Sequence, residues 1–253
     1  FVPERAPLGK VAQLLIFGAN VVSVKGDYRQ TFELSKAAIE KWGFYNRNAG
    51  INPVMTEGKK TVALEIAEQL NWNPTDWVAI SVGDGCTIGG VYNGFYDLLQ
   101  LGMIDRIPKI LGVQSTGCSP FVDADHTDGI LKPTPEDTIA DSIAVGVPRN
   151  PVKAQRAVRD SCGAWIAVSD EDILDAMRLL GRTEGVFGEP AGVTAMAGVK
   201  AAVASGVIKP HESVTVVSTG SGLKDVKNAM IAAGEPFKCE PDINVLEASG
   251  RIR

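Results

Sequence analysis

The chain has 253 residues, 45% of them hydrophobic, which is enough apolar material for one large domain or one and a half ordinary ones. The formal net charge is −5 and the sequence pI is about 5.2, with basic residues scattered among acidic ones. This distribution disfavours nucleic acid and anionic membranes as partners. No apolar run is long enough to span a bilayer, so we expect no membrane association.

The four cysteines (Cys86, Cys118, Cys162, Cys239) stand far apart, and only two histidines accompany them. They form no CxxC pair and no metal-ligand pattern, so we expect no metal site. A chain of this length is not typical of a disulfide framework, and we expect reduced thiols in a cytoplasmic protein. The opening residues Phe1-Val2-Pro3 are typical of the end of a buried strand, and we expect further chain before them.

Apolar residues at helical spacing alternate with short β-branched runs along the chain. The first part predicts helices at 7–17, 32–39 and 57–70 and a strand at 20–24. The second part predicts strands at 77–82, 109–114, 165–168 and 213–218, separated by helices at 150–161, 170–180 and 191–205. The stretch 115–137 is rich in Pro, Asp, Gly and Thr and is expected to form a long loop.

Strands separated by helices favour an α/β fold with mostly parallel, twisted sheets that carry helices on both faces. In such sheets, ligands bind beyond the carboxyl ends of the strands. Motifs that follow a predicted strand are therefore the first candidates for a functional site.

The strongest such motif is SVGDGCTIGG at 81–90, which follows the strand at 77–82 and precedes a helix. Its glycines let successive backbone N–H groups converge, and the helix N-terminus adds partial positive charge, as in phosphate sites. The spacing is neither that of the dinucleotide GxGxxG nor that of the P-loop. Taken alone, this turn is as consistent with a tight structural connection as with an anion site.

Three further motifs have a sufficient structural interpretation when each is taken alone. STGSGLKD at 218–225 follows a strand and contains hydroxyls beside glycines. NPVMTEGKKT at 52–61 combines a turn with a helix start that favours the acidic Glu57. In GEPA, Glu189 precedes Pro190, and it is interpretable either as a cap or as a neighbour of a cofactor.

The order and spacing of the motifs EGKKT, VGDGCTIGG, TIADSI, PRN, GEPA and STGSGLKD resemble those of the threonine synthase family. The similarity runs from the opening FVPERAPLGK to about Ala233. This family depends on pyridoxal 5′-phosphate (PLP) and has the fold-type II architecture of tryptophan synthase β. The resemblance implies a remnant of a smaller N-terminal domain at 1–47, a large PLP-binding domain at 48–253, and a homodimer.

The resemblance also implies roles for particular residues. The backbone of the turn is expected to bind the cofactor phosphate, through Gly83, Asp84, Gly85, Cys86 and Thr87. The Thr219 hydroxyl is expected at the pyridine nitrogen, and three residues are expected at the substrate: Asn52, Glu57 and Lys59. The catalytic lysine of the family, which binds the cofactor as a Schiff base, corresponds to a position before Phe1, so no catalytic residue is assigned within this chain.

Two departures from the family pattern concern the substrate and the turn. Where the family has a serine and an arginine for the substrate's phosphate, this chain has Gly50 and Met55, and methionine supplies no charge-assisted hydrogen bond. The phosphate turn more often has Asn and Gly where this chain has Asp84 and Cys86. Because a carboxylate would repel a phosphate, we expect the Asp84 side chain to turn away and bond the backbone.

The sequence therefore predicts a lyase that converts O-phosphohomoserine and water to threonine and phosphate. A related PLP enzyme that performs elimination or replacement on another amino acid is the first alternative, favoured by Gly50 and Met55. A non-catalytic chain that binds a phosphate-bearing ligand is the second. In the enzyme interpretations the substrate is a small amino acid.

Overall fold

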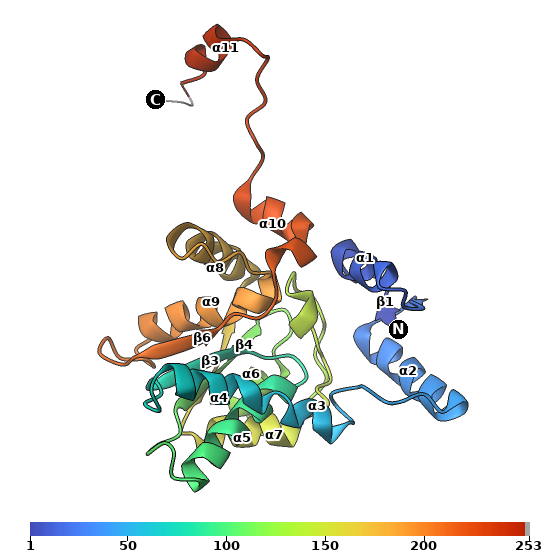
Figure 1. Cartoon of the computed structure of the whole chain (residues 1–253), viewed down its shortest axis with the longest axis vertical. Helices are drawn as coiled ribbons and strands as arrows, with labels where there is room; N and C mark the ends of the chain where they lie inside the picture. Colours follow the sequence, from blue (N-terminus) through green and yellow to red (C-terminus); the bar gives the residue numbers. More distant parts are fainter. Residues whose placement is uncertain (251–253) are drawn as a thin grey trace.

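The computed structural model describes residues 1–250, and its centre is a four-stranded parallel sheet in the order β5–β4–β3–β6 (Figure 1). The strands are β3 (Trp77–Ser81), β4 (Lys109–Ser115), β5 (Ala164–Val168) and β6 (Val214–Val217). In the register, Trp77 lies between Lys109 and Val214. All strands therefore end at the same edge of the sheet, and the predicted α/β class is confirmed.

Helices cover both faces of this sheet, as the alternation of patterns predicts. One face carries α4 (Lys60–Gln69), α5 (Cys86–Gln100), α6 (Pro120–Asp125) and α7 (Pro151–Asp160). The other face carries α8 (Asp170–Thr183), α9 (Pro190–Ala204) and α10 (Val226–Ala233). Each face has its own apolar core, and in the first of them Phe121 stacks on Trp165 with ring centroids 4.8 Å apart.

Helix α9 packs directly on the sheet because many of its buried residues are small. Its sequence is PAGVTAMAGVKAAVA, and it contacts β3, β4 and β5. A Cβ atom placed on Gly198 would lie 2.3 Å from a methyl group of Val113 on β4. The missing side chain at this position is thus what permits the approach of the two backbones.

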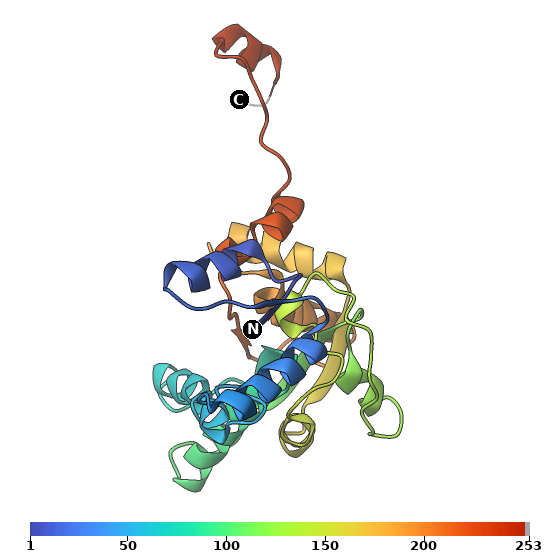
Figure 2. The ribbon, with the colours of Figure 1, turned by 90° about the vertical axis from the view of Figure 1, so that its right-hand side faces the viewer.

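The N-terminal segment 1–47 stands apart from the sheet (Figures 1 and 2). It contains the parallel pair β1 (Val2–Pro3) and β2 (Ser23–Val24), together with α1 (Leu8–Ile16) and α2 (Tyr28–Trp42). Helix α2 begins with a capping box between Asp27 and Gln30 and ends at Gly43 in the left-handed conformation. None of the residues of α1 is buried.

Two predictions of secondary structure need correction. The predicted helix at 57–70 begins later, as α4 at Lys60, because Glu57 belongs to the separate helix α3 (Pro53–Glu57). The break at Gly58-Lys59 packs against Gly90 of α5. The predicted loop at 115–137 contains α6. The buried Gln114 side chain at the end of β4 accepts hydrogen bonds from the N–H groups of Phe121 and Val122, a long-range support that composition does not reveal.

The remaining elements are short. The 3₁₀ turns η1 (Asp141–Ile143) and η2 (Gly222–Lys224) lie before α7 and after β6, and α11 (Ile243–Ala248) projects away from the body of the molecule (Figure 1). No helix within residues 1–250 is long and apolar enough to cross a membrane.

Candidate active site

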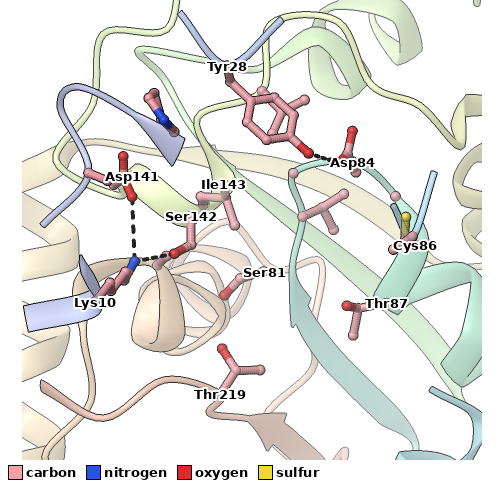
Figure 3. A pocket seen from close by; sticks show the side chains of 18 of the residues that line it. Lys10, Tyr28, Ser81, Asp84, Cys86, Thr87, Asp141, Ser142, Ile143 and Thr219 are labelled. Atoms are coloured by element: carbon pink, nitrogen blue, oxygen red, sulfur yellow. Dashed lines mark hydrogen bonds and ion pairs between the residues drawn. The ribbon is translucent and has the colours of Figure 1, made fainter. Parts of the chain in front are cut away.

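A cavity of about 690 Å³ lies at the carboxyl ends of β3 and β6, between the sheet and the N-terminal segment. Its walls come from the turn 82–88 after β3, from Thr219 after β6, from η1, and from Lys10 and Tyr28 of the N-terminal helices (Figure 3). The motifs that the sequence singled out after β3 and β6 therefore face one another across a single cavity, as the general rule for α/β sheets predicts.

The turn after β3 presents a run of unused hydrogen-bond donors to this cavity. Gly85 is the N-cap of the 15-residue helix α5 and has φ of 83°, the left-handed conformation that favours glycine. The backbone N–H groups of residues 83–88 have no acceptor within the described range 1–250. Because the helix dipole adds partial positive charge at the same place, the turn is suited to an anion.

The two glycines of the turn are fixed from behind by neighbouring elements. A Cβ atom on Gly83 would lie 3.0 Å from the Cα of Ile143 in η1. A Cβ atom on Gly85 would lie 2.8 Å from the Cβ of Ala154 in α7. The backbone of the turn is therefore held tightly where it lines the cavity.

The Asp84 side chain turns away from these donors, as expected, and bonds the backbone. Its Oδ1 accepts the N–H of Arg149 at 3.1 Å, and its Oδ2 accepts the phenol O–H of Tyr28 at 2.7 Å (Figure 3). Burial raises the pKa of the Asp84 carboxyl, which the bonds from Tyr28 and Arg149 partly offset. Burial and the nearby carboxylate of Asp84 raise the pKa of Tyr28, so the phenol remains a donor.

Cys86 has the properties of a packing residue. The thiol is buried and accepts a hydrogen bond from the Asn150 side chain at 2.9 Å. Burial, with the nearby Asp84 carboxylate, raises its pKa, although the helix N-terminus alone would favour a thiolate. Asn150 stands at the predicted helix start of α7, but its side chain makes this contact instead of a cap.

Thr219 lines the opposite wall of the cavity, and its hydroxyl is exposed there. The next residue, Gly220, packs directly on Glu189, so that a Cβ atom at 220 would lie 1.8 Å from the Glu189 Oε1. The Glu189 side chain is 7% exposed and pairs with the Lys10 ammonium at 3.0 Å. Glu189 therefore does not cap α9; it ties the N-terminal segment to the turn that carries Thr219.

The three residues expected at the substrate have different positions. Lys59 lines the cavity, and no carboxylate pairs with it anywhere in residues 1–250. Glu57 lies outside the cavity lining and pairs with Lys60 at 2.6 Å. Asn52 also lies outside the lining, where it caps α3 at Val54 and donates to a backbone oxygen.

Sequence reasoning missed Lys10 and Tyr28, because no motif near either residue indicates a contact with the turn or with Glu189. Both residues reach the cavity from positions distant in sequence. Tyr28, for example, precedes its partner Asp84 by 56 positions. Their positions on the cavity-facing sides of α1 and α2 became clear only with the placement of these helices.

Comparison with known proteins identifies the class of enzyme. A family model described as pyridoxal-phosphate dependent enzyme matches residues 1–220, and the chain belongs to this family. Within it, threonine synthase of Methanocaldococcus jannaschii is 39% identical over 249 residues, and that of Methanosarcina acetivorans is 37% identical over 245 residues. These matches cover 97% and 96% of this chain. The chain spans about 60% of the length of these curated relatives.

Solved structures confirm the fold-type II architecture. Threonine deaminase isoform 2 of Solanum lycopersicum superposes with a TM-score of 0.75 at 23% identity, covering 92% of this chain and 65% of that one. Diaminopropionate ammonia lyase of Escherichia coli gives a TM-score of 0.75 at 18% identity, covering 92% of this chain and 63% of that one. Among the residues that the structure describes, no cluster of side chains is suited to a metal ion.

The geometry fits the cofactor that defines this family. PLP has a phosphate at one end and a pyridine nitrogen at the other. The cavity offers unpaired N–H groups on one wall and the Thr219 hydroxyl on the other. Glycine at 85 allows the left-handed conformation of the turn, and glycine at 83 avoids a tight contact with η1.

Proposed function

We propose that this chain carries the cofactor site of a PLP-dependent carbon–oxygen lyase of the threonine synthase type, which converts O-phosphohomoserine and water to threonine and phosphate. The observation that carries the proposal is the row of unpaired N–H groups at 83–88, which faces Thr219 across a single cavity. The identity of 39% to a curated threonine synthase supports the substrate. When bound, PLP supplies an electron sink for breaking bonds at the amino acid's α-carbon.

The roles of the chain's own residues follow from their positions. The backbone of Gly83, Asp84, Gly85, Cys86 and Thr87 binds the cofactor phosphate. The Thr219 hydroxyl bonds the ring nitrogen, and because a hydroxyl does not hold that nitrogen protonated, the ring is a moderate electron sink suited to elimination and replacement.

Lys59 is assigned to the substrate, since it lines the cavity and its ammonium has no carboxylate partner within residues 1–250. Asn52 and Glu57 are also assigned to the substrate. They stand at the two ends of α3, and Lys59 follows this helix two residues later. The positive charge of Lys59 would attract the negatively charged phosphate or carboxylate of the substrate.

Two lysines line the cavity, and we propose that neither of them binds the cofactor covalently. Lys10 is occupied by Glu189 and by the Ser142 hydroxyl, 3.0 and 2.5 Å away, and Lys59 lies beside the phosphate turn. Borohydride reduction with PLP, followed by peptide mass spectrometry, tests this assignment. A phosphopyridoxyl group on Lys10 or Lys59 would contradict it.

A related PLP enzyme with a substrate that carries no phosphate is the second candidate, and one contact favours it. A Cβ atom at Gly50 would lie 2.4 Å from the Cβ of Arg149, so no serine hydroxyl fits where the family has one. The Arg47 guanidinium contacts the Met55 sulfur at 3.7 Å, and Arg47 is not among the residues that line the cavity.

A substrate panel separates the candidates. We expect phosphate release from O-phosphohomoserine to exceed ammonia or sulfide release from threonine, serine and cysteine. A preference for a non-phosphorylated amino acid would establish the second candidate instead. Turnover of none of these substrates, together with retained PLP binding, would leave a ligand-binding chain without catalysis.

Three further assignments complete the proposal. Residues 1–47 form the smaller domain's contribution and 48–253 the cofactor-binding domain. The enzyme is a cytoplasmic homodimer that acts on a small amino acid. Sedimentation analysis of the purified protein tests the dimer.

A further inference from the structure

A carboxylate stands inside the turn that is proposed to bind a phosphate. Asp84 lies between Gly83 and Gly85, and its own N–H is among the donors of the cradle. An ionised side chain at this position would repel a bound phosphate. The arrangement of the groups around Asp84 therefore decides whether the turn is open to an anion.

Two donors hold this carboxylate away from the free N–H groups of the turn. The Tyr28 O–H on α2 binds Oδ2 at 2.7 Å, and the Arg149 N–H binds Oδ1 at 3.1 Å. The Arg149 guanidinium lies 4.4 Å from the ring centroid of Phe32 and 5.8 Å from that of Tyr28. Its Nε and Nη2 are buried and have no hydrogen-bond partner in the described part of the chain, and its positive charge favours the ionised form of the Asp84 carboxyl.

The nearest competing arrangement uses the donors of the turn itself. An aspartate side chain readily accepts the N–H two or three residues ahead, as in Asx turns and helix N-caps. For Asp84 these are the N–H groups of Cys86 and Thr87, which have no acceptor within residues 1–250. If the carboxylate rotated to them, it would occupy the donors that the phosphate needs.

We propose that Tyr28 is a positioning residue: its hydroxyl keeps the Asp84 carboxylate out of the phosphate cradle, so that the docking of α2 and the binding of the anion favour each other. The proposal rests on the cradle assigned above. It adds a residue of the N-terminal segment, distant in sequence, to the determinants of cofactor affinity. It also explains how this chain uses an aspartate in the turn without losing the cradle.

The test compares two probes that differ only in the phosphate. Pyridoxine 5′-phosphate and pyridoxine have no aldehyde, so neither forms a covalent bond with a lysine. The ratio of their dissociation constants, measured by calorimetry, isolates the contribution of the phosphate. It is measured for the wild type, Tyr28→Phe, Asp84→Asn and the double variant.

We expect Tyr28→Phe to reduce the phosphate preference about tenfold, because the freed carboxylate competes for the cradle. Asp84→Asn should raise the preference, since a negative charge beside the phosphate is removed. In the Asp84→Asn background, Tyr28→Phe should change the preference less than about twofold. Tyr96→Phe, on a half-exposed ring outside the cavity lining, is the matched control and should change nothing.

The outcomes separate this inference from the proposed function. If the wild type binds both probes equally, the cradle is wrong, and the role of Tyr28 falls with it. If the wild type prefers the phosphate but Tyr28→Phe acts equally in both backgrounds, the hydroxyl has only a structural role. Should Tyr28→Phe fail to fold by circular dichroism, Tyr28→Met, which also lacks the hydroxyl, is measured in the same two backgrounds. An unchanged phosphate preference in Tyr28→Met would overturn the proposal.

Discussion

The sheet-bearing part of the molecule and its N-terminal segment are stabilised in different ways. Around the sheet, two apolar cores contain side chains such as Phe95 and Leu111 that are fully buried. In the segment 1–47, α1 buries no residue, and Phe17 is 77% exposed. In the same segment α2 buries only two apolar side chains, Phe32 and Ala38. Polar contacts add to their packing: Arg5 to Glu136 at 2.6 Å, Lys10 to Glu189, and Tyr28 to Asp84.

This difference teaches that the two walls of the cavity have unequal stability. One wall is part of a close-packed core, whereas the other is attached through a few charged and hydroxyl groups. Regions with few buried apolar contacts open at a smaller free-energy cost than the core. The following predictions probe this contrast between the two walls as residues 1–250 form them.

Truncation of an aromatic side chain should show the largest contrast. Phe95→Ala removes a fully buried ring from the core between α5 and the sheet, and we expect a loss of about 3–5 kcal/mol in unfolding free energy. Phe17→Ala removes a ring that is mostly exposed, and we expect a change within about 0.5 kcal/mol. Urea denaturation measures both, and equal losses would refute the contrast.

Substitution of the turn glycine should give the next largest effect. Gly85→Ala adds a left-handed alanine and a contact of 2.8 Å to Ala154, and we expect a loss of about 2–4 kcal/mol together with loss of PLP binding. Gly102→Ala is the matched control, because Gly102 has φ of 68° with no atom within 4 Å. It should cost about 1–2 kcal/mol and retain PLP. Cofactor titration and thermal melting distinguish the variants.

Removal of the Lys10 ammonium should loosen the N-terminal wall. Lys10→Met leaves the Glu189 carboxylate, 7% exposed, without its cation, and we expect a loss of about 1–3 kcal/mol. Hydrogen exchange of α1 should accelerate, while exchange in β3 stays slow. The double variant Lys10→Met/Glu189→Gln should recover most of the loss, and failure to recover would show that the lysine acts by packing alone.

The smallest effect should come from the amino ends of the strands, far from the cavity. The Lys109 ammonium and the Lys209 N–H lower the pKa of Glu212 from 4.5 to about 2. This carboxylate therefore stabilises the fold above pH 4.5, and the contribution is lost as the pH falls to about 2. Glu212→Gln should lower the melting temperature slightly at pH 7 and not at pH 2, with PLP binding unchanged. A difference that grows toward low pH would have the wrong sign.

Much of the sheet-bearing part could be predicted because its signals are local. The apolar runs of β3 and β4 and the glycine turn each depend on neighbouring residues. Contacts between residues distant in sequence were not predictable. The Gln114 side chain accepts a hydrogen bond from the first turn of α6, and Gly90 leaves room for the break after Glu57.

The same division applies to the site. The turn at 83–87 and Thr219 were predicted to share a site, and they line a single cavity. The partners of Asp84 and Glu189 were not, because Tyr28 and Lys10 carry no sequence signal of their own. Side chains that attach one part of a molecule to another depend on the docking of whole helices, which periodicity does not determine.

The close packing of α9 on β4 also limits which substitutions these two elements can accept. Where Gly198 meets Val113, a larger residue on either element would force the backbones apart and shift the Thr219 turn, which lies beside the start of the same helix. A change of substrate that leaves this contact intact would have to come from elsewhere, such as the loops or the N-terminal wall. The helix acts as a fixed spacer against which those more variable parts can diverge.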